Sequence, residues 1–229
     1  MRRMSLVLMV VGTAVVAQSS AEGQSEKDQT TVTGKLVSLE KKGRSTVLTV
    51  ETSSKEKQEF AIDGRVELVI TAKGDVGFLT AGQLIETTAI MSNDLLFGKD
   101  FVVHAAKGGK KPPARLEKAP PKSGQSLNAY AVCGTVVSRQ PDADYKDRET
   151  VILRIGGKKA RVFLDKQFTV SVFLNDPSLV KPGDDVVVEG SSGAGGRFTL
   201  SSATIKLAEP LKAEEFLPDK GRAKKSKDS

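Results

Sequence analysis

The stretch Ala131-Val-Cys-Gly-Thr-Val-Val-Ser138 closely matches an earlier stretch, Thr31-Val-Thr-Gly-Lys-Leu-Val-Ser38, in the type and order of its residues. A second pair of stretches, Leu79-Thr-Ala-Gly-Gln-Leu-Ile-Glu86 and Val180-Lys-Pro-Gly-Asp-Asp-Val-Val187, keeps nearly the same separation. An internal repeat sets the number of domains and has to be recognised before the fold is assigned. The repeat therefore predicts two small domains of similar topology, one for each copy of the pattern.

Within each copy the hydrophobic pattern is that of β-strands. Val32, Gly34 and Leu36 alternate with more polar neighbours, and such a period of two places one set of side chains on the inner face. The segments 72–83 and 174–184 lack this pattern, and Asn175-Asp-Pro-Ser-Leu179 predicts a single helical turn with proline at its first position. Strands are expected at 46–52, 58–62, 66–71, 84–90 and 100–105, and again at 150–155, 159–164, 168–173, 185–190 and 197–205.

Five or six short strands per copy predict an all-β fold of two tandem small Greek-key barrels. The run Leu179-Val-Lys-Pro-Gly-Asp-Asp-Val-Val-Val-Glu-Gly190 resembles a motif of OB-fold-like domains of unknown function in secreted bacterial proteins. The first copy lacks the Asp after its glycine and the closing glycine. The resemblance implies OB-like barrels and assigns no chemistry, because the motif is a turn between strands. An immunoglobulin-like sandwich is the alternative, but such domains usually contain a core Trp, which this chain lacks.

The chain carries a formal net charge of +7, which is distributed unevenly. Residues 107–122 contain six basic side chains, one acidic side chain, four prolines and two glycines. We therefore expect this segment to be a disordered tether. The predicted organisation is a signal peptide (1–21), a disordered segment (22–29), barrel 1 (30–106), a basic Pro/Gly linker (107–128), barrel 2 (129–208) and a disordered basic tail (209–229).

The first residues predict export. Arg2 and Arg3 precede an apolar run that ends in small residues, an order typical of a secretory signal peptide cleaved after Ala17 or Ala21. The run is too short for a membrane span, which needs roughly 20 apolar residues. Cys133 is the one cysteine, so the chain cannot form an internal disulfide, and this favours a periplasmic or extracellular protein of bacteria.

We find no catalytic, cofactor-binding or metal-binding pattern in the sequence. His104 is the one histidine and is expected to be an exposed residue at a strand end. Cys133 is out of phase with the inward residues and is expected to be half-covered on the outer face, although a reactive or intermolecular thiol remains the alternative. The acidic run 142–149 could supply calcium ligands, but Lys146 and Arg148 among its acids favour a solvated loop.

OB-like barrels commonly bind ligands through two loops, here 40–45 with 92–99 and 139–149 with 191–197. The candidates for ligand contact on these loops are charged residues: Lys41, Lys42, Arg44, Asp142, Asp144 and Arg197. Charged side chains on the linker and tail favour contact with a polyanion. These are Lys107, Lys110, Lys111, Arg115, Lys224 and Lys225.

The function that the sequence favours is an exported, non-enzymatic binding or scaffolding module of the bacterial cell envelope. Its partner would be an envelope polyanion or another envelope protein, with no cofactor. One alternative is a hydrolase of envelope polysaccharides whose carboxylates are not recognisable from sequence. The other is a single-stranded nucleic-acid binder, which the absence of Trp and the presence of only two Tyr disfavour.

Overall fold

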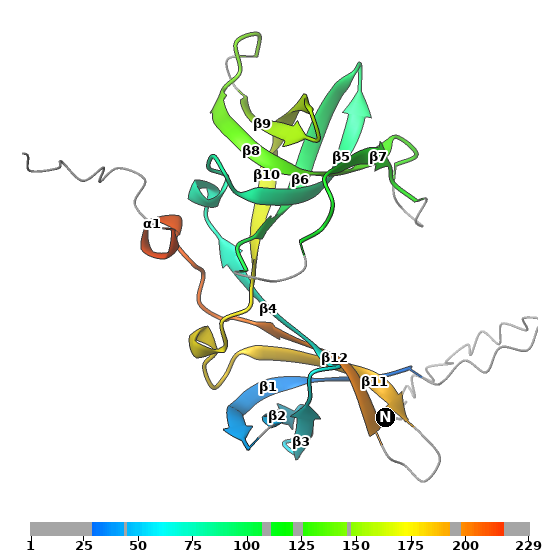
Figure 1. Ribbon diagram of the computed structural model, residues 1–229, viewed down its shortest axis with the longest axis vertical. Helices are drawn as coiled ribbons and strands as arrows, with labels where there is room; N and C mark the ends of the chain where they lie inside the picture. Colours follow the sequence, from blue (N-terminus) through cyan, green and yellow to red (C-terminus); the bar gives the residue numbers. More distant parts are fainter. Residues whose placement is uncertain are drawn as a thin grey trace, which may run out of the picture.

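A computed structural model describes residues 29–43, 45–106, 111–120, 126–145, 148–192 and 198–217. The described part is all-β, as the sequence predicts, and its twelve strands are hydrogen-bonded into one sheet (Figure 1). The strands are β1 (Gln29–Lys42), β2 (Ser45–Thr52), β3 (Lys57–Ile62), β4 (Glu67–Gly74), β5 (Leu84–Ser92), β6 (Leu95–His104), β7 (Arg115–Lys118), β8 (Ala129–Pro141), β9 (Glu149–Ile155), β10 (Lys158–Leu174), β11 (Asp185–Ser192) and β12 (Phe198–Lys206).

Most predicted strands are found close to their expected bounds. β6 is an exception, because it begins at Leu95, inside the loop expected at 92–99. Two runs expected as separate strands, 159–164 and 168–173, form the single 17-residue strand β10. The two non-strand segments each contain a short 3₁₀ turn, η1 (Val76–Phe78) and η2 (Pro177–Leu179). Proline opens η2 as predicted, and the capping side chain is that of Asp176.

The molecule has two lobes, stacked along the long axis of Figure 1. The upper lobe contains β5, β6, β8, β9 and the first part of β10, and the lower lobe contains β1, β2, β3, β11 and β12. In the upper lobe each strand of the series β8, β9, β10, β6, β5 pairs with the next, and β5 pairs with β8.

Strand pairing does not follow the two sequence segments. We expected 30–106 and 129–208 to pair each with itself, but β1 pairs with β11 and β5 pairs with β8. Leu36 exchanges two backbone hydrogen bonds of 2.8 Å with Gly183 and Asp184, and Val136 makes the same two bonds, also of 2.8 Å, with Gly82 and Gln83. Each lobe is therefore built from the first strands of one segment and the last strands of the other.

The two lobes meet where β4 crosses β10. These strands pair in antiparallel fashion, with Ala72 opposite Val172 near the middle of the ladder. On its other side β4 runs parallel to β12, and β10 runs parallel to β6. The turn η1 follows β4 and leads to β5 of the upper lobe, and η2 follows β10 and leads to β11 of the lower lobe. Neither turn folds the chain back as a hairpin. Buried apolar residues of both segments form one continuous cluster, with wholly buried members such as Leu48, Val172 and Ile205.

Two segments expected to be disordered contain ordered structure. Arg115–Lys118 of the expected linker forms β7, which pairs with β8 and covers its otherwise open edge. Residues of the expected tail form α1 (Ala213–Phe216), because Phe216 packs against Phe78 and the Ala213 N–H donates to Asp75 at 3.2 Å. The expected signal peptide, residues 22–28, and residues 218–229 lie outside the described residues.

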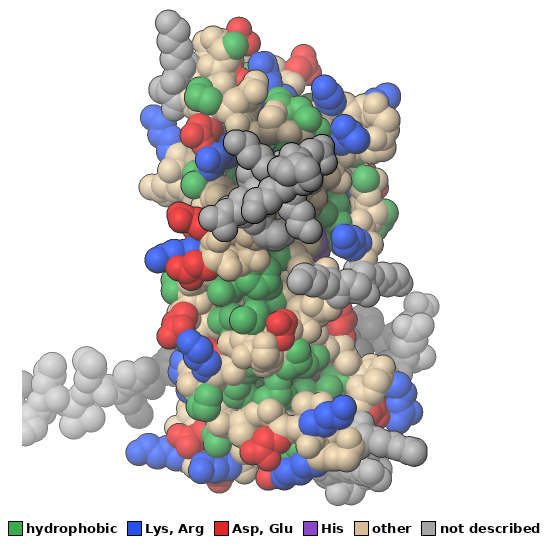
Figure 2. All heavy atoms as spheres, turned by 60° about the vertical axis from the view of Figure 1, so that its left-hand side comes forward, with side chains coloured by type: hydrophobic (Ala, Val, Ile, Leu, Met, Phe, Trp, Pro, Cys, Tyr) green, Lys and Arg blue, Asp and Glu red, His purple; other side chains and the backbone are tan. Residues whose placement is uncertain are grey.

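Figure 2 shows the face that carries α1, with hydrophobic side chains gathered along its middle. The Leu211 N–H of the C-terminal segment donates to the Lys73 carbonyl at 2.8 Å. In the part of the chain that the structure describes, no helix has the length and apolar character needed to cross a bilayer.

Candidate functional site

Two loops from different segments meet at the end of the upper lobe. The β5–β6 turn contains Asn93 and Asp94, both in the left-handed backbone region that short polar side chains tolerate. It lies beside the loop between β8 and β9. We expected the 139–149 loop to be a partner of 191–197, and the exchange of strands places it next to 92–95 instead.

Together the two loops enclose a recess of about 170 Å³. Its lining comes from a hydroxyl, an amide, aromatic rings and one guanidinium group: Ser92, Asn93, Leu95, Phe97, Tyr145, Arg148 and Phe163. Phe97 and Phe163 stack with centroids 5.3 Å apart, because they lie opposite each other on the parallel strands β6 and β10. The Tyr145 ring meets Phe163 edge-on at 5.6 Å and is 45% exposed, so it can contact a ligand.

Asp142 holds the shape of the loop that carries Tyr145. Its carboxylate accepts the backbone N–H groups of Asp144 at 2.9 Å and Tyr145 at 3.1 Å. Only 5% of Asp142 is exposed, and Arg161 compensates its buried charge at 3.3 Å. The loop is closed by the N–H of Asp142, which donates to the Arg148 carbonyl at 2.8 Å. Asp142, predicted as a ligand contact, therefore does not line the recess but fixes the loop that carries Tyr145.

Arg148 supplies the positive charge at the recess. Its guanidinium lies over the Phe97 ring, 5.2 Å from the centroid, and makes no ion pair with any residue that the structure describes. Arg161 differs, because its charge is taken up by Asp142 and by Asp144 at 3.5 Å. A guanidinium stacked on a ring keeps its N–H edges free to bind a second group.

The remaining predicted loop contacts lie away from the recess. Lys41 and Lys42 are exposed at the end of β1, in the lower lobe at the opposite end of the molecule (Figure 1). Asp144 is exposed beside the recess and bonded to Arg161. Arg44 and Arg197 lie outside the described residues, as do Lys107, Lys110, Lys224 and Lys225 of the polyanion set.

Two members of the polyanion set are described and differ in their surroundings. Lys111 is exposed, whereas Arg115 of β7 is bonded to Glu86 of β5.

Cys133 of β8 lies between Glu86 and Arg115 in the sheet, because it is the register partner of both residues. Cys133 is wholly buried, so the half-covered state expected for it is wrong. It is still out of phase with the core residues, and the linker strand β7 lies alongside it. Burial raises the pKa of the Cys133 thiol, and Glu86 adds to this effect against Arg115.

His104 is also more enclosed than the sequence suggests. Its side chain is 14% exposed, with Nε2 3.5 Å from a Glu86 oxygen and the ring edge-on to Phe173 at 5.3 Å. Burial lowers the pKa of His104, and the nearby Glu86 carboxylate opposes that shift. The expected exposed strand-end histidine is therefore a packed residue.

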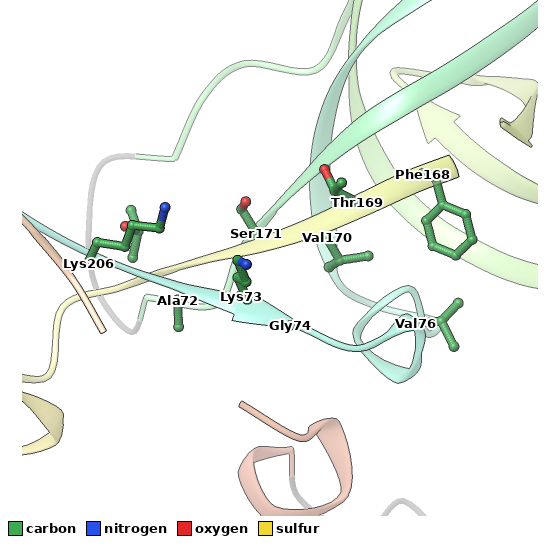
Figure 3. A pocket seen from close by; sticks show the side chains of 10 residues that line it. Ala72, Lys73, Gly74, Val76, Phe168, Thr169, Val170, Ser171 and Lys206 are labelled. Carbon is green, nitrogen blue, oxygen red and sulfur yellow. The ribbon is translucent and has the colours of Figure 1, made fainter. Parts of the chain in front are cut away.

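A second hollow, a groove of about 520 Å³, lies over the crossing of β4 and β10 (Figure 3). Lys206, Ser171 and Thr169 rise to one side of the crossing strands in that view, while Ala72 and Val170 point to the other. Lys73 lines the groove as well, and neither lysine makes an ion pair with a described residue. The groove combines exposed lysines with hydroxyl groups, but none of the described residues that line it is a buried polar side chain, so it is less developed than the recess.

Within the ranges that the structure describes, no three His, Cys, Asp or Glu side chains are grouped to hold a metal ion. Comparison of the chain with protein-family models, curated proteins and solved structures returns no match. The site therefore rests on its geometry. Sequence reasoning missed Phe163 and Arg148, because Phe163 reads as a core residue and Arg148 as part of a solvated loop. Tyr145 and Phe97, aromatic residues in or beside loops, were the available signal.

Proposed function

We propose that the protein is an exported, non-enzymatic binding module of the bacterial cell envelope whose ligand occupies the recess lined by Asn93, Tyr145 and Arg148. The observation that carries this proposal is the built character of the recess. A buried carboxylate fixes one loop, a guanidinium that pairs with no described acid lies over a ring, and an exposed tyrosine completes the wall. Sites organised in this way before the ligand arrives lose less entropy on binding.

The compartment is part of the same proposal and is supported by the sequence alone. Arg2, Arg3 and the apolar run after them have the order of a secretory signal, and Cys133 leaves no pair for a disulfide. We infer a periplasmic or extracellular protein. Its detection in the envelope fraction, cleaved after Ala17 or Ala21, would support export, and an uncleaved cytoplasmic protein would contradict it.

We further infer that the chain arose by internal duplication and that each lobe is a small OB-like barrel. Support comes from the matching bulges, which interrupt β1 between Leu36 and Ser38 and β8 between Val136 and Ser138. The series of five strand pairs in the upper lobe also returns to its first strand. Under this inference the recess is built from one copy's β8–β9 loop and the other copy's β5–β6 turn.

The partner we propose is an acidic polymer of the envelope. Residues 107–122 carry a net charge of +5 and residues 219–229 a net charge of +3, which attract a polyanion over a long range without a fixed pocket. The exposed Lys111 and the two groove lysines add to this positive charge.

The experiment is a sedimentation assay of the mature protein with isolated cell-envelope material. We expect Tyr145→Ala combined with Arg148→Ala to lose most of the bound fraction. The matched control is Lys158→Ala, which removes one exposed positive charge from the upper lobe outside the recess. Equal retention of the double variant and the wild type would overturn the proposed site. Release of soluble fragments from the envelope material would favour the hydrolase alternative.

A further inference from the structure

We propose that the recess binds one acidic sugar residue, a pyranose ring bearing a carboxylate, within a polysaccharide chain. This inference rests on the proposed function, because it names the ligand class of the same site.

The size of the recess limits the ligand to a single ring. Whole small molecules usually occupy pockets of about 300–1,000 Å³, and this recess encloses about 170 Å³. It is also open to solvent along Tyr145, so neighbouring units of a polymer can continue beyond it. A polymer residue with both neighbours outside fits this shape better than a free cofactor does.

The aromatic wall suits the apolar face of a sugar. An aromatic ring presents a negative face, which attracts the polarised C–H groups that line one side of a pyranose. Phe163 is wholly buried and Phe97 is covered by Arg148, so Tyr145 is the ring whose surface is free for this contact. The edge-on contact with Phe163 fixes the orientation of Tyr145.

The charge requirement comes from Arg148. Its planar group can donate two parallel hydrogen bonds to a carboxylate, and stacking on Phe97 fixes the plane in which these donors lie. No described acid neutralises it, whereas Arg161 behind it is fully engaged by Asp142 and Asp144. A neutral sugar would leave this charge unused.

The rim of the recess matches the hydroxyl groups of a sugar. Ser92 offers a hydroxyl and Asn93 an amide, and both are exposed and able to donate and accept. The left-handed backbone of Asn93, with φ of 49°, sets the direction of its side chain at the turn. Alternating donors and acceptors of this kind bind the polyol edge of a ring.

The same surroundings disfavour nucleic acid. A single strand needs a basic channel along its phosphates as well as stacking rings. Here Arg148 is the one cationic side chain among the described residues that line the recess, which is enough for a single carboxylate but does not form a basic channel. A single-stranded DNA oligomer is therefore the contrasting ligand in the test.

The test is a calorimetric titration of the mature protein with an oligogalacturonate, a neutral maltodextrin of similar length and a single-stranded DNA oligomer. We expect the oligogalacturonate to bind at least about tenfold more tightly than either of the others, which is the value of one charged hydrogen-bonded pair. Arg148→Gln should remove that preference, and Arg148→Lys should restore only part of it, because an ammonium cannot bind in a bidentate manner. Tyr145→Ala should weaken binding of every sugar.

Arg154→Gln is the matched control, because this exposed arginine lies on β9 outside the recess. Unchanged thermal unfolding of each variant shows that the fold is kept. Equal affinity for the neutral and acidic oligomers, or stronger binding of DNA, would overturn the ligand class. Absence of sugar binding with envelope retention intact would overturn this inference and leave the proposed function standing. Loss of envelope retention in the unaltered protein would overturn both.

Discussion

At the scale of single residues, two glycines show how closely the strands approach one another. A Cβ atom on Gly34 would lie 2.3 Å from the Glu51 carbonyl oxygen, and one on Gly134 would lie 2.8 Å from the Arg154 carbonyl oxygen. A side chain at either position would therefore crowd the neighbouring strand. Both contacts are with backbone, which cannot move aside as a flexible side chain can.

Gly34→Ala and Gly134→Ala should each destabilise the protein by about 1–3 kcal/mol through this overpacking. The measurement is urea unfolding, followed as a fall in the midpoint. Gly64→Ala is the control, because a Cβ there meets nothing within 4 Å and its backbone is not left-handed. An equal effect of all three substitutions would show that crowding is not the cause.

His104 makes a prediction about pH. Burial lowers its pKa in the folded protein below the ordinary 6.5, against the opposing Glu86, while Lys111 adds to the lowering. The folded state then binds fewer protons than the unfolded state just below pH 6.5, so this contribution to stability is present above 6.5 and is lost as the pH falls. Between about pH 7.5 and pH 5.5 the wild type should lose more unfolding free energy than His104→Gln does. Parallel curves for the two proteins would contradict this.

At the scale of elements, the β8–β9 loop shows how a buried charge shapes a surface. Asp142 does not line the recess, yet it accepts the N–H groups that fix Tyr145 and closes the loop at Arg148. Four acidic side chains in the eight residues 142–149 gave no indication of which one is buried. Asp142 is the buried one because it pairs with Arg161, whose guanidinium lies over the Phe163 ring.

Asp142→Ala should destabilise the protein by about 1–3 kcal/mol, because two partly buried backbone donors lose their acceptor and Arg161 loses a buried partner. It should also weaken ligand binding, since Tyr145 and Arg148 lose their fixed positions. Asp142→Asn keeps an oxygen acceptor and should cost less. Asp144→Ala removes an exposed carboxylate and should change stability by less than about 0.5 kcal/mol. Binding that is unaffected in Asp142→Ala would show that the loop is not organised by this residue.

At the scale of the whole molecule, the exchange of strands ties the two segments together. β1 pairs with β11 and β5 with β8, so neither 30–106 nor 129–208 contains a complete lobe. The ladders of β4 with β10 and with β12, and of β6 with β10, add three more connections. The sequence predicts two independent folding units, which would separate after cleavage of the connecting segment. The exchanged strands predict that the two pieces stay together.

A chain cut at an engineered protease site within 107–110 should therefore remain a one-to-one complex. We expect it to elute from a sizing column with the uncut protein and to separate only in denaturant, because strand pairs and core contacts cross between the pieces. Two pieces that elute separately and each stay folded would contradict the exchanged arrangement. The uncut protein carrying the same inserted site is the control.

The sequence by itself determined the all-β class, most of the strands and their turns, because these depend on local alternation and on glycine at positions such as Gly82 and Gly183, whose backbone is left-handed. It did not indicate β7 or the merger that forms β10. It also placed Tyr145 on a surface loop. The tertiary structure alone decided which strands become partners. Leu36 makes with Gly183 the same bonds that Val136 makes with Gly82, so the local pattern is satisfied by either choice of partner.

The choice made in the structure goes together with the antiparallel pairing of β4 with β10, after which η1 and η2 lead the chain onward. The recess depended on it as well, since Phe97 and Tyr145 come from different segments and meet only in the exchanged arrangement. A pattern of period two specifies which face of a strand is buried, and it contains no information on which of two similar partners lies alongside.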